Sequence, residues 1–487
     1  MIHGEWWVDK RKRYPRPYVP PRHTAAGELL DEGFTGWRLE TLGPLLPRPT
    51  DAVASNGRAD GPTEPLTIWG TDFDGHLYSL LSAHHPQTLR QMPSVYGGVQ
   101  IWHVGAIVKS RDAWVEPDEL VDQVDVYFGD LDAWASDPSE LHDEHDWESD
   151  VLSISVGRHS ATASVADAEI EVRWGRDVSS SIERVSASPG ALIRIIDTLP
   201  IFAVADKWSR PLSQLMSLLM MGTSGVTHMR ARLAGTSATS RPAYLDVRFP
   251  QPFDANRQFD SESSIVGRQH EMLATRKALK SEGIAWSQLL PAYFAAIDDD
   301  GFMTTLSLLT ASQEKTEGFR FDDSLLYAFN GIESLHSTRF VGHVTEEAQV
   351  AKALRELKRQ VPPEFKAAIN PRLATSRRKW MREKLAEVLG ICGGTASALQ
   401  SACPDLVSVL NDARLAVAHA RTEQLSVQEQ VDALVSTQWL LRHGLLQALG
   451  LDADACDNLI LRHLQFKRHV RELTELHSPE ARGGQSN

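Results

Sequence analysis

Two residues near the C-terminus have types and a spacing with which a protein could do chemistry on a phosphate. Arg414 and His419 stand with four residues between them, at the end of a stretch whose apolar side chains recur at helical spacing. An arginine offers a permanent charge and several fixed donors to a phosphate. A histidine gives or takes a proton near neutral pH. Together they could promote attack of a ribose 2′-hydroxyl on the neighbouring phosphate without a metal ion.

The expected products of that attack carry a 2′,3′-cyclic phosphate and a 5′-hydroxyl. Arg414 would stabilise the charge that builds on the phosphate oxygens, and His419 would move the proton. DNA lacks the 2′-hydroxyl and would be spared. The alternative interpretation is that Arg414 is a surface arginine and His419 caps a helix, in a bundle without enzymatic activity.

The elements that must position this pair are helices. Apolar residues form one stripe before and beside Arg414, at Leu406, Val409, Leu410, Ala413 and Val417. Ser426 and Glu429 form a capping box that starts the next helix, which we expect to run to about Leu449. This layout predicts that Arg414 lies inside a helix and that His419 lies at or just past its C-terminal end.

Helical periodicity extends over the whole C-terminal part of the chain. Apolar residues recur at helical spacing over 286–294, 321–336 and 380–389, and a last helix is expected from 454 or 455 onward. We therefore predict an all-α helical bundle over 284–477. Residues 478–487 are polar and are predicted to be a disordered tail.

The N-terminal part, 1–283, is predicted to be β-rich. Runs at 66–70, 99–105, 151–156, 169–174 and 243–249 alternate or cluster β-formers between Gly, Asp, Pro and Ser. The segment 71–76 contains Asp-Gly and indicates a hairpin turn, while 47–65 is a polar loop. Helix signals begin around Pro189, which we interpret as a helical connector. The fold class is therefore α+β, with a β-rich domain followed by a helical one.

Composition and charge limit the function classes. The 487-residue chain has a net charge of −14 and three cysteines, without a CxxC motif that would suggest structural zinc. Of the 50 basic and 64 acidic groups of the chain, residues 301–487 carry 22 of each, so the first 300 residues carry 28 basic and 42 acidic groups. A non-specific nucleic-acid surface is therefore not expected in the N-terminal part. The sequence shows no secretion signal and no apolar run of membrane-spanning length, so a cytoplasmic protein without membrane contact is expected.

A basic cluster in the helical part is the candidate RNA-binding segment. Arg377, Arg378, Lys379 and Arg382 surround Trp380. Cations with an interleaved aromatic ring can hold phosphates and stack a base. The alternative is a solvated helix face with Trp380 in the core.

An acidic segment with two histidines is the candidate metal site. His142 and His145 alternate with carboxylates, and such residues can bind cations. A metal-dependent hydrolase at these residues is a distant possibility. The segment follows a Ser-Asp-Pro-Ser-Glu run, which favours an exposed acidic linker or helix, so we predict no metal and no cofactor.

With these motifs in place, the C-terminal part resembles a HEPN domain. This helical bundle occurs in many prokaryotic RNases, toxins and defence proteins, and its catalytic signature is R-x4-6-H, here Arg414 and His419. The stretch 323–336 resembles the opening helix of the family, with Glu333 as an acidic site residue. The resemblance implies a catalytic role for these three residues. It also implies a two-fold dimer in which two Arg/His pairs form one cleft.

More narrowly, the chain resembles the ApeA-like anti-phage defence proteins, which pair a β-rich N-terminal domain with a C-terminal HEPN domain. The matching segments are Ile-Trp-Gly-Thr-Asp-Phe-Asp-Gly at 68–75, the aromatic stretch 99–109, and Phe-Gly-Asp-Leu-Asp-Ala-Trp at 128–134. The resemblance implies a prokaryotic RNA endonuclease acting by abortive infection, with tRNA among its candidate substrates. It further implies a phage-derived trigger and a homodimer or higher homo-oligomer.

A second function remains open beside the nuclease. Leu415 follows Arg414 at a position where many HEPN sites carry a polar residue, and the charge of the bundle is neutral. Both features favour a non-catalytic HEPN-like module that dimerises or binds a partner.

Overall fold

The structure is a computed structural model of the chain. It describes residues 1–8, 25–31, 37–42, 45, 65–84, 99–111, 114–137, 143–146, 151–154, 159–180, 185–221, 225–235, 244–248, 265–313, 321–340, 353, 356, 359–362, 365, 381–418 and 425–477. Only the backbone is described at 99–100, 143–146, 151–154, 176–180, 185–189, 265–266 and 321.

The chain divides into two compact units. The first comprises Met1–Ser213 and Ser224–Glu262, and the second comprises Gln214–Thr223 and Ser263–Asn487. The first is built mainly of strands and the second of helices, which confirms the predicted α+β class. The change between the units falls earlier than the predicted boundary between 283 and 284.

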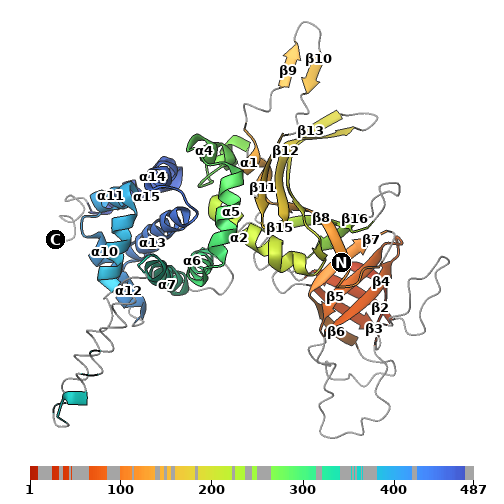
Figure 1. The fold of residues 1–487 in the computed structure, drawn as a ribbon, viewed down its shortest axis with the longest axis horizontal. Coiled ribbons are helices and arrows are strands. Elements are labelled where there is room, and N and C mark those ends of the chain that lie inside the picture. The colour runs from red at the N-terminus through yellow and green to blue at the C-terminus, as the bar shows by residue number, and fades with distance from the viewer. Residues whose placement is uncertain are drawn as a thin grey trace. The chain divides into compact units, whose positions relative to one another are not determined.

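The described strands of the first unit belong to one large antiparallel sheet and a separate hairpin (Figure 1). Their bounds are β1 (Ile2–Trp7), β2 (Ala25–Asp31), β3 (Trp37–Leu42), β4 (Leu66–Asp72), β5 (Leu77–Ala83), β6 (Val99–Val104), β7 (Ala106–Ser110), β8 (Leu120–Phe128), β9 (Asp143–Asp146), β10 (Val151–Ile154), β11 (His159–Val165), β12 (Ala168–Ser180), β13 (Val185–Ile196), β14 (Leu199–Pro200), β15 (Val226–Leu233) and β16 (Tyr244–Arg248). A short helix, α1 (Leu131–Ala135), follows β8.

One end of the large sheet closes on itself. The strand order runs β5-β4-β1-β2-β3-β6, and β6 returns to the end of β5. The backbones of His84 and His103 exchange hydrogen bonds of 2.8 and 2.9 Å there, and the Gly105 N–H donates to the Leu81 carbonyl at 3.1 Å. The closed strands enclose a core of large apolar side chains, among them Trp6 and Trp102. We call this part the closed barrel, since its interior is filled with side chains.

Local signals in the sequence account for the hairpin between β4 and β5. The predicted turn at 71–76 is confirmed, with Gly75 at a φ of 79°. Glycine adopts that left-handed conformation without steric cost. The turn carries Asp72, Asp74 and His76, which are discussed below.

The other end of the sheet corrects one prediction. The helical connector expected from about Pro189 is wrong for its first residues, because Val185–Ile196 form strand β13. The side chains of Ile193 and Ile195 are fully buried, whereas those of the next residues, Arg194 and Ile196, are at least partly exposed. This alternation has the period of a strand, and pairing with β12 and β8 satisfies the backbone. The helix α2 (Arg210–Leu219) begins later, after a π-helical turn at Ala205–Ser209.

The second unit is a helical bundle. Its described helices are α3 (Ile265–Gln269), α4 (Arg276–Ser281), α5 (Trp286–Ile297), α6 (Asp300–Ala311), α7 (Phe321–Arg339), α10 (Met381–Ile391), α11 (Gly393–Ala402), α12 (Leu406–Ala418), α13 (Val427–Ala448), α14 (Ala453–Arg462) and α15 (Leu464–His477). No described helix is long and apolar enough to cross a membrane.

Helix α13 forms the centre of this bundle and contacts α6, α7, α10, α11, α12, α14 and α15. The predicted capping box is confirmed: the Ser426 hydroxyl accepts from the Glu429 N–H at 3.2 Å, and the Glu429 carboxylate accepts from the Ser426 N–H at 2.7 Å. From Asp432 to Leu446 nearly every residue of α13 is buried, so it has no solvent face over three turns. The neighbouring helices α7, α10 and α12 also contact one another, and they carry the candidate site.

Candidate functional site

The structure brings together two of the three residues predicted for catalysis. Arg414 lies in the last part of α12 and Glu333 lies in α7, and the guanidinium Nη2 is 3.3 Å from the Glu333 Oε1. The exposed fractions of the two side chains are 34% and 37%. The pair is therefore reachable from solvent, and a ligand phosphate could take the place of one of its contacts.

A third charged residue reaches the same carboxylate from another helix. The Lys384 Nζ on α10 lies 3.8 Å from the Glu333 Oε2, and its side chain is only 16% exposed. Two cations thus share one carboxylate, which leaves an excess of one positive charge on the trio. Such an excess at a partly buried point favours binding of an anion such as a phosphate.

One helical turn away, the same two helices form a second side-chain contact. His336 of α7 lies 2.5 Å from Glu387 of α10, and its ring stacks on Phe340 at 4.8 Å. Glu333 and His336 are three residues apart, as are Lys384 and Glu387, so each pair shares one helix face. The two contacts hold α7 and α10 together at positions one helical turn apart.

Several predicted residues lie where the structure gives no description. His419 follows the last residue of α12 in sequence but lies outside the described residues, as do Arg377, Arg378 and Lys379. Arg382 is described and is exposed on the first turn of α10. The prediction that Arg414 lies inside a helix is confirmed by the bounds of α12.

Lys384 and His336 were not assigned to the site by sequence. The residues that they contact, Glu333 for Lys384 and Glu387 for His336, lie 51 positions away in the chain. No short-range spacing links such residues. The candidate metal segment also lacks a described site, because His142 lies outside the described residues and His145 lies in β9 with its backbone alone described.

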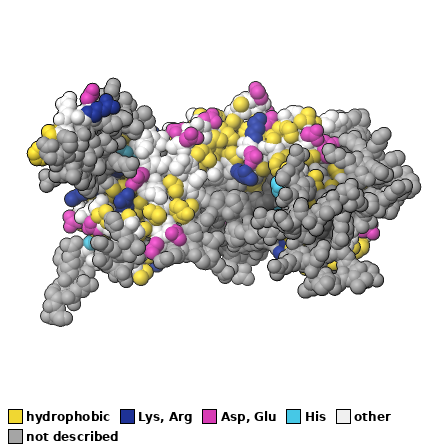
Figure 2. Space-filling view, turned by 90° about the horizontal axis from the view of Figure 1, so that it is seen from below, with side chains coloured by type: hydrophobic (Ala, Val, Ile, Leu, Met, Phe, Trp, Pro, Cys, Tyr) yellow, Lys and Arg dark blue, Asp and Glu magenta, His cyan; other side chains and the backbone are white. Residues whose placement is uncertain are grey.

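Charged side chains are mixed elsewhere on the described surface. On the face drawn in Figure 2, described lysine and arginine side chains occur singly or in small groups among acidic ones, without a continuous basic tract. An extended electrostatic surface for nucleic acid is therefore absent from the described part of this face. Binding of RNA would have to depend on a local cleft.

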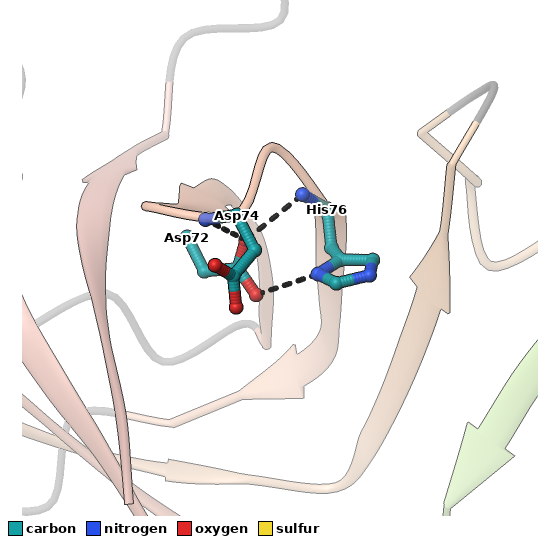
Figure 3. A group of neighbouring side chains, drawn as sticks. All are labelled: Asp72, Asp74 and His76. Atoms are coloured by element: carbon teal, nitrogen blue, oxygen red, sulfur yellow. Dashed lines mark hydrogen bonds and ion pairs between the residues drawn. The ribbon is translucent and has the colours of Figure 1, made fainter.

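A second cluster lies in the turn between β4 and β5 (Figure 3). Asp72, Asp74 and His76 each offer a ligand atom, and these atoms lie within 4.8 Å of one another. No other described group of histidine, cysteine and carboxylate side chains is close enough to hold a metal ion. Asp72 already accepts four hydrogen bonds, from the backbone N–H groups of Asp74 and His76, the His76 Nδ1 and the Tyr78 hydroxyl, at 2.9–3.0 Å.

These hydrogen bonds explain the acidity of Asp72. Burial acts to raise the pKa of the Asp72 carboxyl, but the backbone of His76, the hydroxyl of Tyr78 and the ring of His76 together hold this pKa below its ordinary value. Burial, followed by the bond to Asp72, raises the pKa of the Tyr78 hydroxyl above its ordinary range. The hydrogen bonds of this cluster therefore stabilise the hairpin between β4 and β5.

We predict that Asp72→Ala destabilises the first unit by about 2–3 kcal/mol, because it leaves the buried Tyr78 hydroxyl and two turn N–H groups without their acceptor. Urea unfolding of the full chain, followed by tryptophan fluorescence, measures the change. Asp74→Ala is the matched control: Asp74 is exposed, its carboxylate accepts no hydrogen bond from the described residues, and a change within about 0.5 kcal/mol is expected. Equal losses of stability in the two variants would contradict a stabilising role for the Asp72 hydrogen bonds.

Comparison with known proteins identifies the N-terminal part. The family model ApeA N-terminal domain 1 matches residues 1–285, which is more than half of the chain. Searches of curated proteins and of solved structures find no match. The chain therefore belongs to the family defined by ApeA N-terminal domain 1 and is an ApeA-like defence protein.

Proposed function

We propose that the protein is a metal-independent RNA endonuclease of the HEPN class that acts in phage defence by abortive infection. The observation that carries the proposal is the contact between Arg414 and Glu333, close to the end of the helix that leads to His419. A half-exposed guanidinium held by one carboxylate is both oriented and able to engage a phosphate.

In the proposed reaction, the RNA supplies the nucleophile. His419 accepts the proton of a ribose 2′-hydroxyl as its oxygen attacks the adjacent phosphorus, and the bond to the 5′-oxygen breaks. A proton returned to that oxygen gives the 5′-hydroxyl, and the other product retains a 2′,3′-cyclic phosphate. Arg414 stabilises the charge on the phosphate oxygens.

Lys384 and Glu333 support this role of Arg414. Glu333 keeps the guanidinium in place while no RNA is bound, and Lys384 partly neutralises Glu333, so that the carboxylate repels an incoming phosphate less. Arg382, with the predicted RNA-binding residues Arg377, Arg378 and Lys379, would hold the flanking strand.

The N-terminal unit has the regulatory role in this proposal. It responds to a phage-derived trigger and controls the nuclease, whose RNA substrates include tRNA. Two copies of the chain form a homodimer or a higher homo-oligomer, in which two Arg/His pairs line one cleft. Cleavage of host RNA after infection then stops phage production.

The second candidate function is a non-catalytic HEPN-like module that dimerises or binds a partner. Leu415, next to Arg414, is 40% exposed. An exposed leucine beside the proposed site fits a protein contact better than contact with a phosphate.

Mapping of RNA ends tests the two candidates. The purified full-length protein is incubated with total RNA in EDTA, and the ends are sequenced by methods that distinguish cyclic phosphates from other termini. The nuclease predicts new 2′,3′-cyclic phosphate and 5′-hydroxyl ends, and the binding module predicts none. The same mapping in cells that express the wild type or His419→Ala identifies the RNA. Activity that appears only with added metal would contradict the proposed mechanism.

A further inference from the structure

A cavity of about 620 Å³ lies at one end of the closed barrel. Its residues come from the first residues of β1, β3 and β5, the last residues of β4, β7 and β16, and the turn after β4. We call it the barrel-mouth pocket. Its apolar floor consists of Trp37, Tyr78 and Ile107, which belong to the barrel core. The volume lies in the range of cavities that hold small organic ligands.

Two cations stand over aromatic rings of this floor. The Lys109 Nζ lies 5.7 Å from the centre of the Tyr78 ring, and the Arg248 guanidinium carbon lies 5.8 Å from that of Trp37. In the register of β7 and β16, Lys109 faces Asp246 and Arg248 faces Ile107, so these four residues lie on one face of the sheet.

Neither cation has a carboxylate partner within the described part of the chain. Asp246, directly opposite Lys109, instead lies 3.6 Å from the Arg230 Nε and 3.5 Å from the His228 Nε2. Asp72, which also lines the pocket, already accepts four hydrogen bonds. Two cations without an ion-pair partner among the described residues can bind an anionic group on this aromatic floor, beside the carboxylates of Asp72, Asp74 and Asp246, because ammonium and guanidinium donors form short, strong bonds to phosphate oxygens.

The turn after β4 supplies other contacts to the pocket. Phe73, at the tip of the turn, is 86% exposed, and a planar ring could stack on it. The neighbouring Asp74 carboxylate is exposed and can accept from hydroxyl or amino groups. A ligand that combines an anion with a planar ring and hydrogen-bond donors could use the cations, Phe73 and Asp74 together. A ribonucleotide has this chemistry.

We propose that the barrel-mouth pocket binds a free mononucleotide, with its phosphate at Lys109 and Arg248. The overall charge favours a free nucleotide over a nucleic-acid strand, because residues 1–300 carry 42 acidic and 28 basic groups and would repel a long polyanion. The inference goes beyond the proposed RNA cleavage and does not depend on it, since binding is measured in the absence of RNA.

Calorimetric titration of the full-length protein tests the proposal with AMP, GMP, CMP, UMP and ATP as probes. We expect at least one nucleotide to bind at a submillimolar Kd, and its nucleoside and inorganic phosphate alone to bind at least tenfold more weakly. Absence of binding by all five probes would overturn the proposal. Tighter binding of a short oligoribonucleotide than of any mononucleotide would also overturn it in favour of a strand.

Substitutions locate the binding. The double variant Lys109→Met, Arg248→Met keeps the side-chain stems over the rings but removes both charges, and it should weaken nucleotide binding by about 10- to 100-fold. Arg173→Ala, which removes a 42% exposed arginine paired with Glu171 on β12, is the control and should leave the Kd unchanged. Thermal unfolding verifies that the double variant and the control fold. If the double variant does not fold, the single variants Lys109→Gln and Arg248→Gln are measured in its place. Unchanged binding after removal of either charge would place the nucleotide elsewhere.

Discussion

Arg414→Ala is expected to lower the rate of the proposed RNA cleavage by about 10²–10³-fold, because it would remove the charged donor that is proposed to stabilise the developing charge on the phosphate. Single-turnover cleavage of a defined RNA measures this loss. Arg462→Ala is the matched control: it removes another arginine of the helical unit, also paired with a glutamate, with its Nη1 3.0 Å from the Glu282 Oε1. That guanidinium lies on α14 and contacts none of the candidate site residues among the described interactions, so its loss should leave the rate unchanged.

The double variant Arg414→Ala, His419→Ala should abolish both RNA cleavage in EDTA and toxicity in cells. Residues that act in one step are not additive, so the double variant should be only slightly slower than the more damaged single variant. Glu333→Gln keeps the size of the side chain but removes its charge, and it should change the rate less than Arg414→Ala. If the double variant still cleaves RNA in EDTA, the assignment of this site is wrong. If all variants unfold at lower urea concentration than the wild type, the loss is structural.

Local signals predicted several elements of the fold, among them the helix that carries Arg414. The capping box at Ser426 is a four-residue pattern, and it placed the start of α13 because both of its hydrogen bonds form within one turn. The Asp-Gly turn before β5 was likewise visible, since Gly75 needs a positive φ. The apolar stripe of α12 predicted its helix, and with it the position of Arg414.

Contacts between distant residues were outside the reach of such patterns. The two side-chain contacts between α7 and α10 join residues 51 positions apart, and the barrel closes through backbone bonds between His84 and His103. Neither depends on a local motif. The sequence predicts a helical region where strand β13 forms, because the apolar residues alone do not show the partner strands β8 and β12 that satisfy its backbone.

The helical unit is expected to lose roughly 5 kcal/mol of its free energy of unfolding between pH 7.5 and pH 4.5. Two buried histidines cause the loss. Burial lowers the pKa of His463 to about 4; the backbone of Glu271 opposes this, and the charge of Arg442 adds to it. Burial also lowers the pKa of His469 to about 4, with Glu472 acting in the opposite direction. Both side chains are nearly inaccessible to solvent.

The surroundings of the two rings explain why neutral imidazole is favoured. The His463 ring lies 5.3 Å from the ring of Trp439, over which Arg442 also stands at 4.9 Å, so a second charge would be added beside a buried cation. The His469 Nε2 lies 2.8 Å from the Ser436 hydroxyl. Its Nδ1 is 3.9 Å from Asp432, whose own pKa is raised chiefly by burial, so this carboxylate compensates little for a charged ring.

The direction follows from proton linkage. Both pKa values lie below the ordinary 6.5, so the unfolded chain binds protons more readily than the folded chain as the pH falls. The stabilisation is complete above pH 6.5 and is lost as the pH falls toward 4. At about 1.4 kcal/mol per pH unit, each ring accounts for about 2.7 kcal/mol by pH 4.5. The sum is comparable to the whole stability of many domains, so acid should unfold the helices before it protonates these rings in the folded state.

Urea unfolding at pH 7.5 and pH 4.5, followed by circular dichroism at a helix-sensitive wavelength, measures the difference. The variant His463→Gln, His469→Gln replaces both rings by side chains that do not titrate, so its stability should change much less between the two pH values, even if it is lower at both. His270→Gln, which removes an exposed histidine of the same unit, should keep the pH dependence of the wild type. If the double variant retains the full acid sensitivity, other groups cause it. His443, another buried histidine of the unit, on α13, would then be examined first, because burial lowers its pKa against the charge of Asp457.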